Sequence, residues 1–161
     1  MKDEKLLANP STLDLVGMKY VDRSLAIACT RGREAIVSRF RELLRREDLS
    51  EQQWRVLRIL FDIGPITSIE ISAHACIHKV SISRILRSLE SRGLVSRKAS
   101  RSDARASIVE LTSTGHKAML PLVDEATEIH SGIARDFGVD RYEQLLQLLR
   151  ELSEINNPVV P

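Results

Sequence analysis

The chain has 161 residues and a formal net charge of +2, with 43% hydrophobic and 29% charged residues. This composition is typical of a globular protein with one sizeable core or two smaller lobes, and it excludes a low-complexity or fibrous chain. The sequence contains no run of 18 apolar residues and no signal-peptide pattern, so we expect a cytoplasmic protein without a membrane anchor.

A long helix is predicted over residues 20–47, after an N-terminal extension at residues 1–19 that shows no periodic pattern. No proline interrupts the stretch, and Cys29 and Val37 belong to an apolar stripe with helical spacing. Arg33 lies on the same stripe, where a charge is costly unless an anion neutralises it. Two interpretations of Arg33 stay open: an ion pair with a carboxylate of another helix or of a partner subunit, or a receptor for the carboxylate of a ligand.

A second helix is predicted to begin after Ser50, because Ser50 and Gln53 have the spacing of a capping box. It runs through WRVLRILFDI and ends at Gly64, which Pro65 follows. Trp54 lies on the face predicted to point inward, and oppositely charged residues spaced i,i+4 mark the solvated face. This helix should therefore pack against a core.

Residues 67–112 predict a short helix, a turn, a longer basic helix and two strands joined by a polar loop, which is the order of a winged helix-turn-helix. One face of the longer helix is apolar and carries Ile82, Ile85, Leu86 and Leu89. The opposite face carries Val80, Arg84, Arg87 and Ser91. Because residues follow one another at about 100° around a helix, this helix can pack on a core and present two guanidinium groups outward. Gly93 is expected to end it.

The segment from Lys79 to Arg105 is strongly basic, with eight basic residues, two acidic residues and a local net charge of +6. The remainder of the chain then carries −4, since the whole chain carries only +2. A basic lobe on an otherwise slightly acidic protein is the electrostatic footprint of a protein that binds the phosphate backbone of nucleic acid. The alternative is a basic face that interacts only with solvent.

Two further helices are predicted after the winged segment. The first begins at Thr112 as its N-cap and reaches about Phe137, and the second spans Val139 to Ile155. Both carry more apolar surface than one small lobe can cover, as does the helix at residues 20–47. We therefore expect these helices to pack against a second copy of the chain in a homodimer.

The stretches LSEQQWRVLRIL, SRILRSLESRGLV and DARASIVELTSTG resemble the multiple-antibiotic-resistance regulator (MarR) family of bacterial transcription factors. The resemblance covers nearly all of residues 20–155, and TRGREAIVSRFRELL is similar to the branch of homoprotocatechuate-degradation regulators, which respond to aromatic acids. It implies a mainly α-helical fold with a small β-wing. A winged helix-turn-helix lobe at residues 50–112 would bind DNA, flanked by long dimerisation helices at residues 20–49 and 113–157.

The resemblance also implies a homodimer whose recognition helices enter successive major grooves of a DNA operator and whose wings reach minor grooves. The residues expected to contact DNA are Lys79, Val80, Ser81, Ser83, Arg84, Arg87, Arg101, Asp103 and Arg105. Asp103 and Arg105 match the D-x-R motif of the family's wing, in which the aspartate orients an arginine that a narrow minor groove attracts. The chain departs from the family at His78, where an aspartate N-cap is common.

The expected function is that of a ligand-responsive bacterial transcriptional regulator, a repressor that a small aromatic carboxylate releases from DNA. Arg33 would face the carboxylate, and Val37 and Trp54 would offer apolar walls. We expect neither an enzyme nor a cofactor, because the sequence has no phosphate-binding glycine loop, no H-E-x-x-H and no G-x-S-x-G motif.

A metal- or thiol-sensing regulator of the same fold is the alternative function. His74, Cys76 and His78 form the pattern H-x-C-x-H, whose side chains suit Zn²⁺ but converge only if the helix breaks at this point. Cys29 and Cys76 are the candidate thiols for an oxidation sensor. The simpler interpretation, which we favour, is that both cysteines are small buried hydrophobic residues in a reducing compartment and that no metal is bound.

Overall fold

The computed structural model describes residues 19, 21, 24–99 and 107–155. The chain forms two compact units, Met1–Ile36 and Val37–Pro161, and helix α2 (Leu25–Arg46) contributes to both. The other helices of the second unit are α3 (Glu51–Ile63), α4 (Ser68–Ala75), α5 (Lys79–Ser91), α6 (Ser113–Phe137) and α7 (Val139–Glu154). None of the helices in the described ranges is long and apolar enough to cross a membrane.

Helices α3, α4 and α6 begin at a serine or threonine whose hydroxyl caps a free backbone N–H group. Ser50 accepts a hydrogen bond from the backbone of Gln53, and the Gln53 side chain accepts one from the backbone of Ser50. Thr67 forms the same reciprocal capping box with Glu70 at the start of α4. At the start of α6 the Thr112 hydroxyl accepts the Gly115 N–H at 2.9 Å. The predicted starts at Ser50 and Thr112 are therefore confirmed.

A three-stranded antiparallel sheet follows the order β1-β3-β2, with β1 at Ile66–Thr67, β2 at Val95–Ala99 and β3 at Ser107–Leu111. Strands β2 and β3 are the two that the sequence predicts, and Arg97 pairs with Val109 in their register. Strand β1 is not predicted, because two residues are too few to show an alternating pattern. The chain from α3 therefore joins the sheet before it enters α4.

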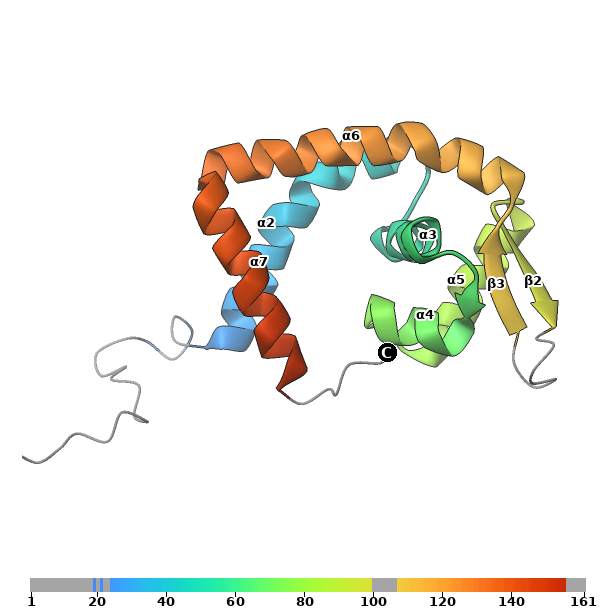
Figure 1. Cartoon of the computed structure of the whole chain (residues 1–161), viewed down its shortest axis with the longest axis horizontal. Coiled ribbons are helices and arrows are strands. Elements are labelled where there is room, and N and C mark those ends of the chain that lie inside the picture. The colour runs from blue at the N-terminus through green and yellow to red at the C-terminus, as the bar shows by residue number, and fades with distance from the viewer. Residues whose placement is uncertain (1–18, 20, 22–23, 100–106, 156–161) are drawn as a thin grey trace, which may run out of the picture. The chain divides into compact units, whose positions relative to one another are not determined.

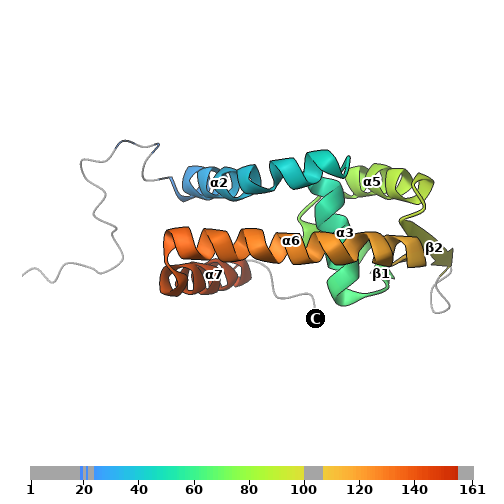
Figure 2. The same cartoon turned by 90° about the horizontal axis from the view of Figure 1, so that it is seen from above.

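One hydrophobic core joins α2, α3, α4, α5, α6 and the sheet, and α7 contributes no buried residue to it. In Figure 1 the sheet, α3, α4 and α5 gather near one end of α6, and α7 folds back from its other end. Figure 2 shows that α3 crosses α6. The most deeply buried side chains of this core are Leu43, Val56, Leu57, Leu60, Ile71, Ile82, Leu86, Leu89, Val95, Val109 and Met119. This arrangement is the winged helix-turn-helix with long flanking helices that the sequence predicts.

Gly115 lies in the first turn of α6, where that helix touches the start of the wing. A Cβ atom on Gly115 would come within 2.0 Å of the Leu94 carbonyl oxygen, which is far inside any allowed contact. The Thr112 N–H also donates to this carbonyl at 3.1 Å. The junction between wing and helix therefore requires glycine at this position.

We predict that Gly115→Ala lowers the free energy of unfolding by about 1–3 kcal/mol, because the methyl group forces α6 away from the wing. Gly132→Ala in the same helix is the matched control, since its Cβ would meet nothing closer than 3.8 Å. The control should be neutral or gain up to about 1 kcal/mol from helix propensity. Urea unfolding at one fixed protein concentration measures both, and a Gly115→Ala protein as stable as wild type would contradict the predicted clash.

Candidate nucleic-acid interface

The recognition helix α5 buries one face and exposes the other, as its sequence predicts. Ile82, Leu86 and Leu89 are fully buried in the core, and Ile85 is 8% exposed. On the opposite face Arg84, Arg87 and Ser91 are exposed, and Val80 is 67% exposed. Burial of the apolar face therefore gives the two guanidinium groups a defined outward direction.

Both ends of α5 are closed by local hydrogen bonds. At its start the Val80 N–H donates to the His78 ring at 3.4 Å, so the histidine serves as a long, weak N-cap in place of an aspartate. At its end Gly93 has a φ of 68°, and its N–H donates to the Glu90 carbonyl at 2.9 Å. The Leu94 N–H donates to the Leu89 carbonyl at 3.0 Å, which completes a Schellman motif.

The turn before α5 is held by side chains of the preceding helices. The Ser72 hydroxyl donates to the Ile77 carbonyl at 2.6 Å, and the Arg55 guanidinium donates to the Ala75 carbonyl at 2.7 Å. Arg55 also forms an ion pair with Glu51 of its own helix. Since these contacts come from α3 and α4, the start of the recognition helix is positioned by the rest of the lobe.

The basic residues of this lobe divide into two groups. Arg92 donates to backbone carbonyls, Arg97 lies 3.3 Å from a carboxylate oxygen of Glu90, and Lys98 pairs with Glu110 and lowers the pKa of that carboxyl group. By contrast, within residues 24–99 and 107–155, no hydrogen bond or ion pair engages the side chains of Lys79, Arg84 and Arg87. These three cations therefore remain available to a polyanion.

The other residues expected to contact DNA differ in what the structure says of them. Ser83 is exposed and Ser81 is partly exposed on α5. Arg101, Asp103 and Arg105 belong to the wing loop and lie outside the described residues. Their contact with a minor groove stays a prediction.

The expectation that both cysteines are buried is wrong. Cys29 and Cys76 are both exposed in the chain. Cys76 has a φ of 50°, because α4 ends there in a left-handed residue that turns the chain toward α5. The helix thus breaks at the point that a metal site would need, but the described part of the chain contains no cluster of three or more metal-ligating side chains.

The residues expected to bind a ligand occupy different parts of the chain. Arg33 is exposed on α2 and belongs to the first unit, whereas Val37 and Trp54 are partly buried and belong to the second. Their grouping around a ligand therefore stays a prediction. Arg58 lies one turn beyond Trp54 on α3, and its Nε donates to Asp62 at 2.7 Å, which is one of the i,i+4 pairs that mark the solvated face in the sequence.

His130 of α6 lies near Arg58 and adds a titratable group to this side of α3. Burial, followed by the charge of Arg58, lowers the pKa of His130. Its ring is tilted against Phe40 at a centroid distance of 5.1 Å, and its Nδ1 lies 3.3 Å from the Tyr142 hydroxyl. Aromatic and cationic groups from α2, α3, α6 and α7 therefore meet here.

Comparison with known proteins gives a consistent result. The model of the MarR family matches residues 49–107. The chain is 33% identical over 134 residues to the HTH-type transcriptional regulator FarR of Neisseria gonorrhoeae. The aligned region covers 83% of this chain and 92% of that protein. It is 34% identical over 134 residues to the homoprotocatechuate degradative operon repressor of Escherichia coli, with coverage of 83% and 90%.

Two solved structures show the same fold at comparable identity. The transcriptional regulator PA4135 has a TM-score of 0.80 and 36% identity, covering 83% of this chain and 98% of that chain. NadR in complex with 4-hydroxyphenylacetate has a TM-score of 0.75 and 32% identity, covering 82% of this chain and 96% of that chain.

We expect Arg84→Ala to weaken binding to a cognate duplex by about 1–3 kcal/mol, the value for an arginine paired with a guanine edge. Binding to a scrambled duplex should change much less. Fluorescence anisotropy with a duplex selected by the wild-type protein from a randomised library measures both affinities. Arg45→Ala is the control, since Arg45 is exposed and, within the described residues, pairs with Glu42 of its own helix alone.

Equal losses on the cognate and scrambled duplexes would instead identify Arg84 as a phosphate contact. An unchanged affinity on both would remove Arg84 from the interface.

Proposed function

The chain belongs to the MarR family of transcriptional regulators, and from this we propose that it is a ligand-responsive repressor that binds a pseudo-palindromic operator as a homodimer. The observation that carries the proposal is the outward face of α5. There Arg84 and Arg87 are exposed and, within the described residues, unpaired, on a lobe with a local net charge of +6.

The geometry and charge of this lobe support DNA binding. The exposed face of α5 would lie in a major groove, with Arg84 and Arg87 toward the bases and Lys79 near a phosphate. In a two-fold symmetric dimer the second α5 would enter the groove about one helical turn away. The wing residues Arg101, Asp103 and Arg105 would reach the adjacent minor groove. Affinity should fall steeply with salt, because phosphate contacts release counterions.

The homodimer is supported by the apolar surface of α7. No residue of this helix is buried in the single chain, although it carries a row of leucines. Leu145, Leu148, Leu149 and Leu152 are each at least 40% exposed. We propose that residues 20–49 and 113–157 form the dimerisation region, that residues 50–112 form the DNA-binding lobe, and that residues 1–19 are an extension of the first part.

We predict that the protein sediments as a dimer of about twice 18.1 kDa at micromolar concentration. Leu148→Glu should shift it toward the monomer, because Leu148 is 54% exposed in the chain and a carboxylate would be buried in the dimer. Ile63→Glu is the control, since Ile63 is 50% exposed at the end of α3 and outside the proposed dimerisation region. A wild-type protein that sediments as a stable monomer would rule out the dimer and the two-half-site operator.

The proposed effector is a small aromatic carboxylate that releases the repressor from DNA. The support comes from relatives: one is named for the homoprotocatechuate degradative operon, and NadR has been solved with 4-hydroxyphenylacetate. In this chain we assign the carboxylate to Arg33, whose planar guanidinium can bind it with two hydrogen bonds. Val37, one turn further along α2, and Trp54 would provide apolar walls. DNA and effector would then weaken each other's binding by the same factor.

Titration calorimetry with benzoates, phenylacetates and cinnamates tests this assignment. We predict that one acid binds the wild-type protein and that Arg33→Ala weakens it by about 10-fold or more, the loss expected for a charge-assisted hydrogen bond. Arg58→Ala is the matched comparison, because Arg58 offers a second guanidinium one turn from Trp54. A loss in Arg58→Ala alone would transfer the carboxylate to Arg58, and no binding by any acid would remove the aromatic-acid assignment.

A further inference from the structure

The C-terminal end of the recognition helix is bound to the corner between α2 and α3, which is formed by residues 47–50 and is called here the α2–α3 corner. The Arg92 guanidinium donates to the Asp48 carbonyl at 2.7 Å through one terminal nitrogen, and to the Glu47 carbonyl at 3.0 Å through the other. Arg92 is itself the C-cap of α5. One side chain thus joins the end of the recognition helix to a backbone more than forty residues earlier in the sequence.

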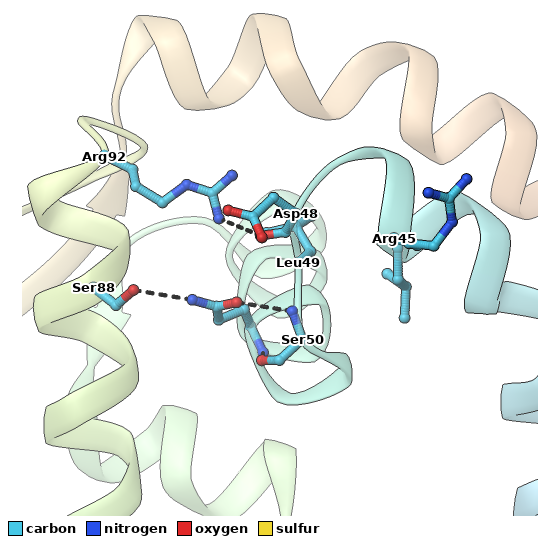
Figure 3. A pocket seen from close by; sticks show the side chains of 8 residues that line it. Arg45, Asp48, Leu49, Ser50, Ser88 and Arg92 are labelled. Carbon is cyan, nitrogen blue, oxygen red and sulfur yellow. Dashed lines mark hydrogen bonds between the residues drawn. The ribbon is translucent and has the colours of Figure 1, made fainter.

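A second hydrogen bond joins α5, one turn earlier, to the first turn of α3, which follows the corner directly. The Gln53 side-chain amide donates to the Ser88 hydroxyl at 3.0 Å in a partly buried position. Ser88 and Arg92 are spaced i,i+4 and therefore share a face of the helix. Figure 3 shows both residues on the side of α5 that faces Asp48 and Ser50. Two contacts on one face of α5, at different heights along its axis, restrict its tilt and the rotation that remains once its apolar face is buried.

The backbone of the α2–α3 corner is held in place by its own hydrogen bonds and by burial of Leu49. Asp48 has a φ of 50°, the Leu49 N–H donates to the Leu44 carbonyl at 2.9 Å, and the Leu49 side chain is only 9% exposed. Ser50 then caps α3. The corner carbonyls lie at the C-terminal end of α2, where the helix dipole carries partial negative charge and favours a guanidinium.

We propose that Arg92 is a positioning residue for DNA recognition, which fixes the rotation of α5 relative to the α2–α3 corner and does not contact DNA. This inference rests on the proposed function as a DNA-binding regulator. The side chains of a helix reach a radius of about 5–6 Å, so a rotation of about 10° displaces their tips by about 1 Å. Hydrogen bonds to base edges tolerate distances of only about 2.7–3.2 Å. A small rotation is therefore enough to remove the base contacts of Arg84 and Arg87.

The competing explanation is that Arg92 is one more phosphate contact of the basic lobe. The structure argues against it, because both terminal nitrogens of the guanidinium already donate to carbonyls. Arg92, Gln53 and Ser88 line a surface pocket of about 390 Å³. If Arg92 were shortened, this open space would leave no neighbouring side chain in place to take over its hydrogen bonds. Lysine keeps the charge but cannot reproduce the two-pronged geometry. Charge and geometry can thus be separated by substitution.

The experiment compares Arg92→Gln, Arg92→Lys and Ser88→Ala with wild type. The probe is the duplex that the wild-type protein selects from a randomised library, together with a scrambled version and versions with one or two base pairs inserted at the centre. Arg45→Gln is the matched control, because Arg45 lines the same pocket and points away from Arg92 in Figure 3. In the part of the chain that the structure describes, it pairs with Glu42 alone. Thermal unfolding of each variant confirms that it is folded.

We expect Arg92→Gln and Arg92→Lys to lower affinity for the selected duplex by about 10-fold or more, because at least one base contact per half-site is lost. Affinity for the scrambled duplex should change by less than about 2-fold, and the dependence of affinity on salt should stay unchanged, because no phosphate contact is lost. Ser88→Ala should show the same pattern at smaller amplitude, and the penalty for an inserted base pair should shrink in all three variants.

Two results would overturn the inference. The first is an Arg92→Lys protein with wild-type affinity, together with an Arg92→Gln protein that loses equally on both duplexes and shows a salt slope smaller by about one per lost phosphate contact. The second is an Arg92→Gln protein that behaves like Arg45→Gln. A wild-type protein that enriches no duplex would be a different failure, since it overturns the proposed function and this inference with it.

Discussion

The structure depends on burial of the apolar face of α5. Each of Ile82, Leu86 and Leu89 is removed from solvent completely, which is worth about 1.5–3 kcal/mol per side chain. Because the residues of a helix are rigidly spaced, the direction of the buried face also sets the direction of the opposite face. The core of the lobe thus sets the face on which the outward arginines lie, although none of them belongs to it.

Electrostatics in this lobe has two separate roles. Some cations stabilise the fold, as Arg92 does on the carbonyls of the α2–α3 corner and Lys98 does beside Glu110. Arg84 and Arg87 have no such role within the described residues, so removing their charge should cost little stability. Not every basic residue of this segment is therefore free to contact DNA directly. A substitution of a basic residue here can act through stability or through DNA binding.

Much of the fold could be predicted from the sequence, because its signals are local. The capping residues Ser50 and Thr112, the apolar stripe of α5 and Gly93 each act within a few residues along the chain. Long-range contacts could not be predicted in this way. Nothing near Arg92 in the sequence indicates that its partners are Glu47 and Asp48, and the two-residue strand β1 exists only because it pairs with β3.

Cys76 and Arg58 are further examples of residues whose surroundings depend on the fold and could not be predicted from their neighbours in the sequence. Cys76 was expected to be a small buried residue, but it is the left-handed residue that ends α4, and it is exposed. Arg58 was assigned to the solvated face through its pairing with Asp62. That pairing is present, yet Arg58 also lies near His130 of a helix that follows much later in the sequence.

The close approach of Gly115 to Leu94 has a mechanical consequence. The Thr112 hydroxyl donates to the Gly93 carbonyl at 2.6 Å, so the end of α5, the start of the wing and the first turn of α6 are joined without a flexible linker. A displacement of the first turn of α6 would therefore move the start of the wing and the end of the recognition helix with it. This tight junction makes the first turn of α6 an unfavourable place for a hinge.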